Sequence, residues 1–241
     1  MRRAALLSLA VLLGLTTAVR GYELLRVTKN PCDHSAHNLF WRDAAVNVSE
    51  GQLPDAQRAI AEEARTTWNA SLSRFRFGLG GGDPCTRDGV VSLDIADTAC
   101  DLGDFGDALA ITRSVWKGDG ELIDADVTFN ANTYIINDDA AFLHVALHEL
   151  GHALGLAHSD SCGASGDGTL MKAVLGNHPF DAPQGDDVAG AEAIYPSGNS
   201  GGDGSVPEGA NSCAIVAPPR SRAACPLIGV AVLLLLRRRR T

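Results

Sequence analysis

The sequence predicts an α+β domain with a mixed five-stranded sheet, a long histidine-bearing helix and a C-terminal helix. Most segments with a strand pattern come before the two helices expected near the C-terminal end of the body. This order is typical of a fold in which helices pack on one face of a sheet. The body between residues 22 and 196 holds about 175 residues, enough for one domain with its own core.

Each element has its own signal. Short runs rich in valine, isoleucine and aromatic residues predict strands over 39–48, 74–77, 90–95, 109–115 and 122–129. Ile60, Ala64 and Trp68 follow a helical period after Pro54, and this spacing predicts a helix over 56–69. Two further helices are expected over 140–154 and 187–195.

The stretch from His148 to His158 reads H-E-x-x-H-x-x-G-x-x-H. On a helix, His148 and His152 leave the same face one turn apart, so both imidazoles can reach one tetrahedral Zn²⁺. Gly155 lets the helix end, and the chain can then return His158 as a third ligand. Three protein ligands leave one position open, which indicates a catalytic site with Glu149 as its base.

Two other interpretations of these histidines are weaker. A helix with coincidental histidines on a polar face would not reproduce the whole motif. His144 stands four residues before His148 and could form a competing ligand pair with it. That pair has no glutamate directly after its first member, so we expect His144 to pack beside the ligands instead.

The motif and its surroundings resemble the matrixin branch of the metzincin zinc endopeptidases. Ser159 follows the third histidine, as it does in matrixins, and Met171 lies where this clan has its Met-turn methionine. Residues 186–195 resemble the final matrixin helix, and 124–129 resemble the strand before the zinc helix. The resemblance covers about residues 22 to 196.

The resemblance implies a metzincin-like fold and hydrolysis of peptide bonds in extended segments of protein or peptide substrates. Zn²⁺ would be the catalytic metal, held by His148, His152 and His158, with its bound water activated by Glu149. Substrate would add as a strand to a sheet edge, which the resemblance assigns to Leu109, Ala110, Ile111 and Thr112. Structural Ca²⁺ is also expected from the family.

The sequence departs from the matrixin pattern at two places. Ala173 stands where matrixins often have a proline, and the stretch after Met171 lacks the tyrosine that other branches use as an extra ligand. We expect no cysteine-switch propeptide. Cys32 could block zinc as a thiol or join a disulfide, so latency is left unexplained.

The composition excludes some partners. Between residues 22 and 196 there are 11 Lys and Arg against 27 Asp and Glu, which argues against nucleic acid or anionic lipid as a partner. Solubility explains this charge, and calcium binding is the alternative. The acidic candidates for calcium form two groups: Asp97, Asp101, Asp104 and Asp107, and then Asp119, Asp124 and Asp126.

The cysteines fall into a set of four and a set of two. Cys32, Cys85, Cys100 and Cys162 lie in the body and predict up to two disulfides. Three pairings are open, of which the one joining Cys85 to Cys100 closes the shortest loop. Cys213 and Cys225 lie in the C-terminal segment.

The two ends predict export. Residues 1–21 have the basic start and short apolar run of a signal peptide. A Gly- and Ser-rich linker is expected over 197–212, and 213–241 resembles bacterial sorting tags built from a cysteine, a short apolar helix and arginines. The apolar run 226–236 spans only about 16 Å as a helix, too short to cross a bilayer. An ordinary tail anchor or a buried helix is the alternative.

We therefore expect an exported monomer at the cell envelope or surface, or secreted, after transient retention in the inner membrane. A membrane enzyme that processes the tag would be a further partner. Two other functions stay open: an inactive zinc-binding surface or adhesion module, and a metal-dependent hydrolase of non-peptide bonds. The intact Glu149 argues against the first, and Met171 with the candidate edge strand argues against the second.

Overall fold

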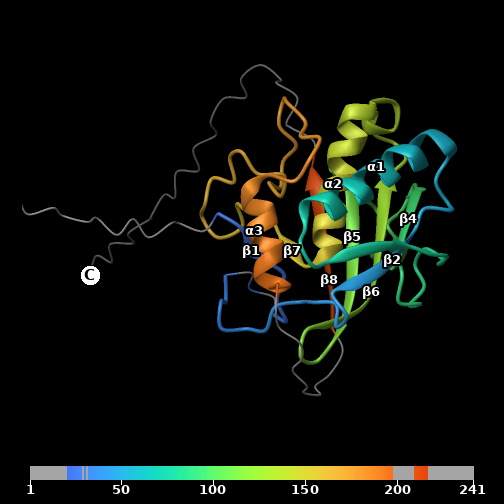
Figure 1. The fold of residues 1–241 in the computed structure, drawn as a ribbon. Coiled ribbons are helices and arrows are strands. Elements are labelled where there is room, and N and C mark those ends of the chain that lie inside the picture. The colour runs from blue at the N-terminus through green and yellow to red at the C-terminus, as the bar shows by residue number, and fades with distance from the viewer. Residues whose placement is uncertain (1–20, 29, 31, 198–208, 217–241) are drawn as a thin grey trace, which may run out of the picture.

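The computed structural model describes residues 21–28, 30, 32–197 and 209–216. Its main sheet runs in the order β3-β2-β4-β6-β5-β8 (Figure 1). The members are β2 (Ala45–Ser49), β3 (Arg76–Leu79), β4 (Val91–Ala96), β5 (Ala108–Lys117), β6 (Glu121–Asn130) and β8 (Gly209–Val216). β2, β3, β4 and β6 are parallel, whereas β5 is antiparallel to both of its neighbours.

This arrangement confirms the predicted α+β class, and the five predicted strands form the mixed sheet. β8 is an additional strand, built from residues that we expected to be partly linker and partly sorting tag. The predicted boundary between residues 212 and 213 falls inside it. The predicted signal peptide lies outside the described residues except for Gly21, and so do 198–208 and 217–241.

The first strand begins later than predicted, at Ala45 instead of residue 39. Trp41, whose aromatic character favoured a strand, lies in a turn where its indole N–H donates to the Ala153 carbonyl at 2.8 Å. Ala44 then has a φ of 49°, a left-handed conformation that does not fit a strand. Trp41 therefore packs against the end of α2, and Phe40 makes only an isolated bridge to Glu121 at the start of β6.

The helices are α1 (Asp55–Ser71), α2 (Asp139–Leu154) and α3 (Gly185–Ile194). α1 buries Ala64 and Trp68, as their spacing predicts. Ile60, in contrast, is only half-buried, and Ala61 is buried beside them. The Trp68 indole donates to the Leu147 carbonyl at 2.9 Å and so joins α1 to α2. In Figure 1, α3 lies beside β1 (Glu23–Leu24) and β7 (Leu156–Ala157), which pair antiparallel in a second, small sheet.

α2 is buried along nearly its whole length. Asp138 caps its start by accepting a hydrogen bond from the Ala141 amide at 3.1 Å. Two short 3₁₀ segments lie between the main elements: Cys100–Leu102 before β5 and Tyr134–Asn137 before α2. α2 ends before Gly155, which has a φ of 121°, and a Cβ there would lie 2.8 Å from the Leu39 carbonyl oxygen. Only glycine fits this position, and it lets the chain turn back toward His158.

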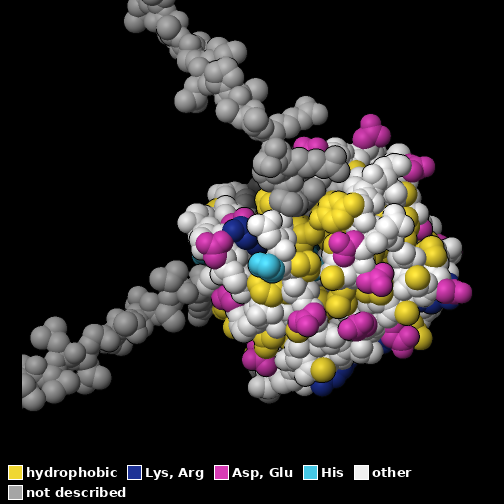
Figure 2. Space-filling view, turned by 90° about the horizontal axis from the view of Figure 1, so that it is seen from above, with side chains coloured by type: hydrophobic (Ala, Val, Ile, Leu, Met, Phe, Trp, Pro, Cys, Tyr) yellow, Lys and Arg dark blue, Asp and Glu magenta, His cyan; other side chains and the backbone are white. Residues whose placement is uncertain are grey.

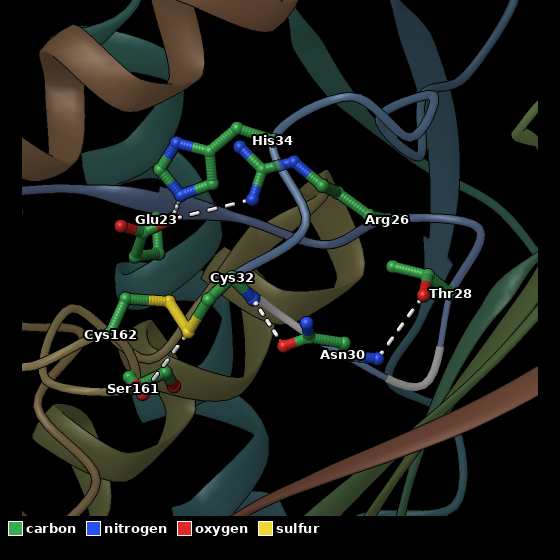
Figure 3. The surroundings of a disulfide bond; sticks show 8 residues. All are labelled: Glu23, Arg26, Thr28, Asn30, Cys32, His34, Ser161 and Cys162. Carbon is green, nitrogen blue, oxygen red and sulfur yellow. Dashed lines mark hydrogen bonds and ion pairs between the residues drawn. A yellow bond between two sulfur atoms is a disulfide. The ribbon is translucent and has the colours of Figure 1, made fainter.

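Two disulfides pair the four body cysteines. Cys85 joins Cys100 across the shortest loop, and Cys32 joins Cys162 across 130 residues. Figure 3 shows the second bridge tying the N-terminal segment to the loop that follows His158, with Glu23 pairing Arg26 and His34 nearby. Cys32 is therefore a disulfide partner rather than a thiol directed at zinc. Within the described residues, no helix is both long and apolar enough to cross a membrane.

Candidate functional site

The three predicted zinc ligands converge at the C-terminal end of α2. Nε2 of His152 lies 3.0 Å from Nε2 of His148 and 3.1 Å from Nε2 of His158. His148 and His152 are fully buried. The structure thus brings two histidines from α2 and one from the segment after β7 to a single point, as the motif predicts.

The other nitrogen of each helical histidine contacts a backbone carbonyl. Nδ1 of His148 lies 2.9 Å from the Leu170 oxygen, and Nδ1 of His152 lies 2.8 Å from the Leu156 oxygen. A proton on each Nδ1 donates to these carbonyls, which leaves the Nε2 lone pairs free. Burial, followed by the charge of the neighbouring histidines, holds the pKa of His148 and of His152 well below its ordinary value.

Three neutral imidazoles with converging lone pairs form the donor set that suits Zn²⁺. Within the described part of the chain, one other group has potential ligand atoms within 4.8 Å of one another: Glu23, His34 and Cys162. Cys162 is already in a disulfide, so this second group does not offer a thiolate. The histidine trio fits the implied metal.

Glu149 is fully buried beside this trio. Its Oε2 accepts a hydrogen bond from the Thr112 hydroxyl at 2.5 Å, which joins the carboxylate to β5. Burial raises the pKa of Glu149 to about 8, while the Thr112 hydroxyl and the backbone amides of Ile215 and Thr112 act in the opposite direction. Sequence reasoning placed Thr112 on the substrate strand but did not foresee that it orients the base.

Met171 lies under the zinc helix. It is buried, and a Cβ at Gly151 would overlap its Sδ, so the methionine packs against the turn between His148 and His152. The Met171 carbonyl also accepts from the Ser159 amide at 2.9 Å, which ties this turn to the segment that carries His158. Met171 thus packs against α2, and its role as a Met-turn methionine stays a prediction.

Asp187 also holds this turn, a role that only part of its local sequence predicts. Its buried carboxylate accepts from the amides of Leu170, Met171 and Gln184 at 2.9, 3.1 and 2.8 Å. A carboxylate three residues into a helix after a polar N-cap is the local signal for a capping box. The contact to Met171 spans 16 residues and has no such signal.

His144 does not join the metal cluster. Its Nδ1 accepts from the Phe180 amide at 2.7 Å, and the two rings stack with centroids 5.8 Å apart. Burial lowers the pKa of His144 to about 4, so the imidazole is neutral and can accept this hydrogen bond. His144 therefore fixes the loop after Met171, in agreement with its predicted packing role.

The predicted substrate strand is placed beside the site, but its outer edge is covered. Leu109, Ala110, Ile111 and Thr112 all lie on β5, and β8 pairs along that edge. Glu149 contacts β5 through Thr112, so the edge and the catalytic residues are adjacent. A segment of the same chain, β8, therefore occupies this edge, and substrate binding at residues 109–112 stays a prediction.

The acidic groups proposed for calcium do not form a compact cluster. In the described residues, no group of three or more His, Cys, Asp or Glu ligand atoms within 4.8 Å includes these aspartates. Asp124 and Asp126 are nevertheless both buried on β6. Figure 2 shows that Asp and Glu outnumber Lys and Arg on the face seen from above. Structural calcium stays a prediction.

Asp126 makes the stability of the fold depend on pH. Burial, together with the charge of Asp124 and Asp88, raises its pKa to about 8, although Arg113 acts in the opposite direction. Between pH about 4 and about 8 the folded protein therefore holds a proton that the unfolded chain has released. This contribution to stability is complete below pH about 4 and is lost as the pH rises to about 8.

Replacing Asp126 by asparagine should remove this dependence. We expect Asp126→Asn to be more stable than the parent at pH about 8, with the difference shrinking toward pH about 4. Urea unfolding of both proteins across this range measures the difference. Asp107→Asn, which alters an exposed carboxylate, is the matched control. A difference that does not change with pH would contradict the prediction.

Comparison with known families agrees with the site. Residues 94–196 match the family model Peptidase_M10, described as Matrixin. A search of curated proteins finds no match to the chain. The matched region begins inside β4 and contains β5, β6, α2 and α3, with all three histidines, Glu149, Met171 and Asp187. The match supports a matrixin-like zinc metalloprotease for this part of the chain.

Proposed function

We propose that the protein is an exported zinc-dependent endopeptidase that hydrolyses peptide bonds in extended protein segments. The observation that carries the proposal is the convergence of three histidine Nε2 atoms beside the buried Glu149. The match to the matrixin model supports the same chemistry. Export is proposed because residues 1–21 have the basic start and the short apolar run of a signal peptide.

His148, His152 and His158 would hold the metal. Zn²⁺, when bound, would polarise the peptide carbonyl and lower the pKa of a water molecule to near 7. The carbonyls of Leu170 and Leu156 keep the two helical imidazoles in the tautomer that presents Nε2. The ligand geometry is thus set by the protein before a metal arrives.

Glu149 moves the proton. Its carboxylate accepts a proton from the attacking water and passes it to the nitrogen of the leaving amine. The Thr112 hydroxyl fixes Oε2, which keeps the carboxylate directed at the site. An extended substrate would lie against β5 and receive its orientation from backbone hydrogen bonds.

A metal-dependence experiment tests the proposal. The full chain is titrated with zinc and incubated with quenched peptides, an unfolded protein and simple esters, with and without chelator. We expect one zinc per chain and peptide cleavage that chelator abolishes and zinc restores. β8 occupies the β5 edge where substrate is proposed to bind, so cleavage is expected to begin slowly if β8 must first leave. The incubation is therefore continued until the amount of cleaved peptide reaches a constant value.

The other outcomes separate the alternatives. Zinc binding without cleavage of any peptide bond, whether in added substrates or in the chain itself, would contradict the proposal and favour an inactive binding module. Turnover of esters without turnover of peptides would instead indicate a hydrolase of non-peptide bonds.

A further inference from the structure

β8 lies where an extended substrate is expected. It runs antiparallel to β5, and the register pairs Ala110 with Ile215, Ile111 with Ala214 and Thr112 with Cys213. In Figure 1, β8 borders β5 next to α2, which carries the histidines and Glu149. A segment far along the chain therefore occupies the sheet edge at the candidate active site.

Ile215 anchors β8 to the body of the protein. It is fully buried and belongs to the main hydrophobic core. β8 also contacts α2, and the backbone amide of Ile215 is close enough to the Glu149 carboxylate to lower its pKa, although burial raises that pKa overall. Thr112, which pairs with Cys213, donates to the same carboxylate. The backbone of β8 thus lies close to Glu149, the proposed proton donor to the leaving amine.

We propose that the chain is its own substrate and cuts the Ala214–Ile215 peptide bond in β8. The inference rests on the proposed endopeptidase function. Water adds across the bond: its oxygen becomes part of the Ala214 carboxylate, and a proton passes through Glu149 to the Ile215 nitrogen, which becomes a free amine. The register places Ala214 opposite Ile111 and Ile215 opposite Ala110, directly before Thr112, whose hydroxyl donates to Glu149.

The cut would have two consequences. It would separate the body from residues 215–241, which contain Cys225, the apolar run and the terminal arginines. It would also free the β5 edge at Ala108 and Ala110, which pair with Val216 and Ile215, while residues 209–214 stay paired with the rest of β5. Release from the C-terminal segment and opening of the site would therefore be one event.

The test uses the full chain. The protein is purified without metal, and hydrogen exchange is measured at residues 209–216, whose amides should be protected in the parent but not in Ile215→Asp; equal exchange in the two proteins would overturn the inference. The protein is then loaded with zinc and sampled over time by intact mass spectrometry. We expect products ending at Ala214 and beginning at Ile215, with a rate that does not depend on protein concentration because the reaction is intramolecular. Cleavage of quenched peptides by the same samples should begin after a lag that follows the self-cleavage.

Ile215→Asp and Leu79→Asp form a matched pair. Burying a charge at residue 215 opposes docking of β8, so self-cleavage should slow at least about tenfold while peptide cleavage loses its lag. Leu79 is an exposed apolar residue on β3, at the opposite edge of the sheet. The Leu79→Asp chain should cut itself at the parent's rate.

Other outcomes overturn the inference in distinguishable ways. If the 214–215 bond of the parent stays intact while the parent or Ile215→Asp cleaves added peptides, the inference fails and the endopeptidase function stands. A self-cleavage rate that rises with concentration would show cutting between molecules and would also overturn it. If neither protein cleaves anything, the proposed function itself fails.

Discussion

Replacing Glu149 by glutamine is expected to lower kcat for peptide hydrolysis by a factor of about 10² to 10⁴. Glutamine has the shape of glutamate and can still accept a hydrogen bond from the Thr112 hydroxyl. Its amide cannot take a proton from water and pass it to the leaving amine. Because Glu149 is not among the three converging ligands, zinc binding should be nearly unchanged.

Steady-state cleavage of a quenched peptide, with zinc content measured on the same samples, checks this result. Glu192→Gln is the matched control, because it makes the same chemical change at an exposed position on α3. A Glu149→Gln protein that keeps its zinc and also the parent's rate would show that another group acts as the base. Loss of zinc would show instead that the carboxylate holds the metal.

Replacing Asp187 by alanine is expected to destabilise the fold by roughly 3 kcal/mol or more, because three amides lose their acceptor and buried groups without partners are costly. These amides belong to Leu170, Met171 and Gln184. Met171 packs under the zinc helix, and the Leu170 carbonyl accepts from His148. The loss should therefore also weaken zinc binding.

Urea unfolding and a zinc titration measure the two effects. Asp181→Ala removes an exposed carboxylate from the neighbouring loop and should change neither quantity appreciably. Equal stability of the Asp187→Ala and Asp181→Ala proteins would mean that water satisfies the three amides. A large loss of stability with unchanged zinc affinity would separate this turn from the metal site.

The five strands, the three helices and the convergence of the histidines follow from local patterns. Alternating apolar residues mark a strand with one buried face, and apolar residues at helical spacing mark a helix with one buried face. The structure has a strand or a helix at each segment where we found such a pattern. The zinc motif is equally local, since Gly155 both ends α2 and starts the return to His158. The first strand is the exception, because Trp41 packs against α2 rather than in the sheet.

Contacts between distant segments could not be predicted in the same way. Residues 209–216 contain glycine, asparagine and serine, which indicate a linker when read alone. They form a strand because β5 offers an unpaired edge about a hundred residues earlier in the chain. The hydrogen bond from Thr112 to Glu149 and those from Leu170 and Met171 to Asp187 likewise depend on folding rather than on sequence spacing.

The bridge between Cys32 and Cys162 makes the third zinc ligand sensitive to the redox state of its surroundings. Cys162 lies four residues after His158, and the bond closes a loop of 130 residues. Closing so long a loop stabilises a fold by about 5 kcal/mol in the chain-entropy model. A thiol reductant would release this constraint without touching the metal. Oxidising conditions therefore favour full assembly of the proposed metal site, and reduction of this bridge would leave His158 less firmly held.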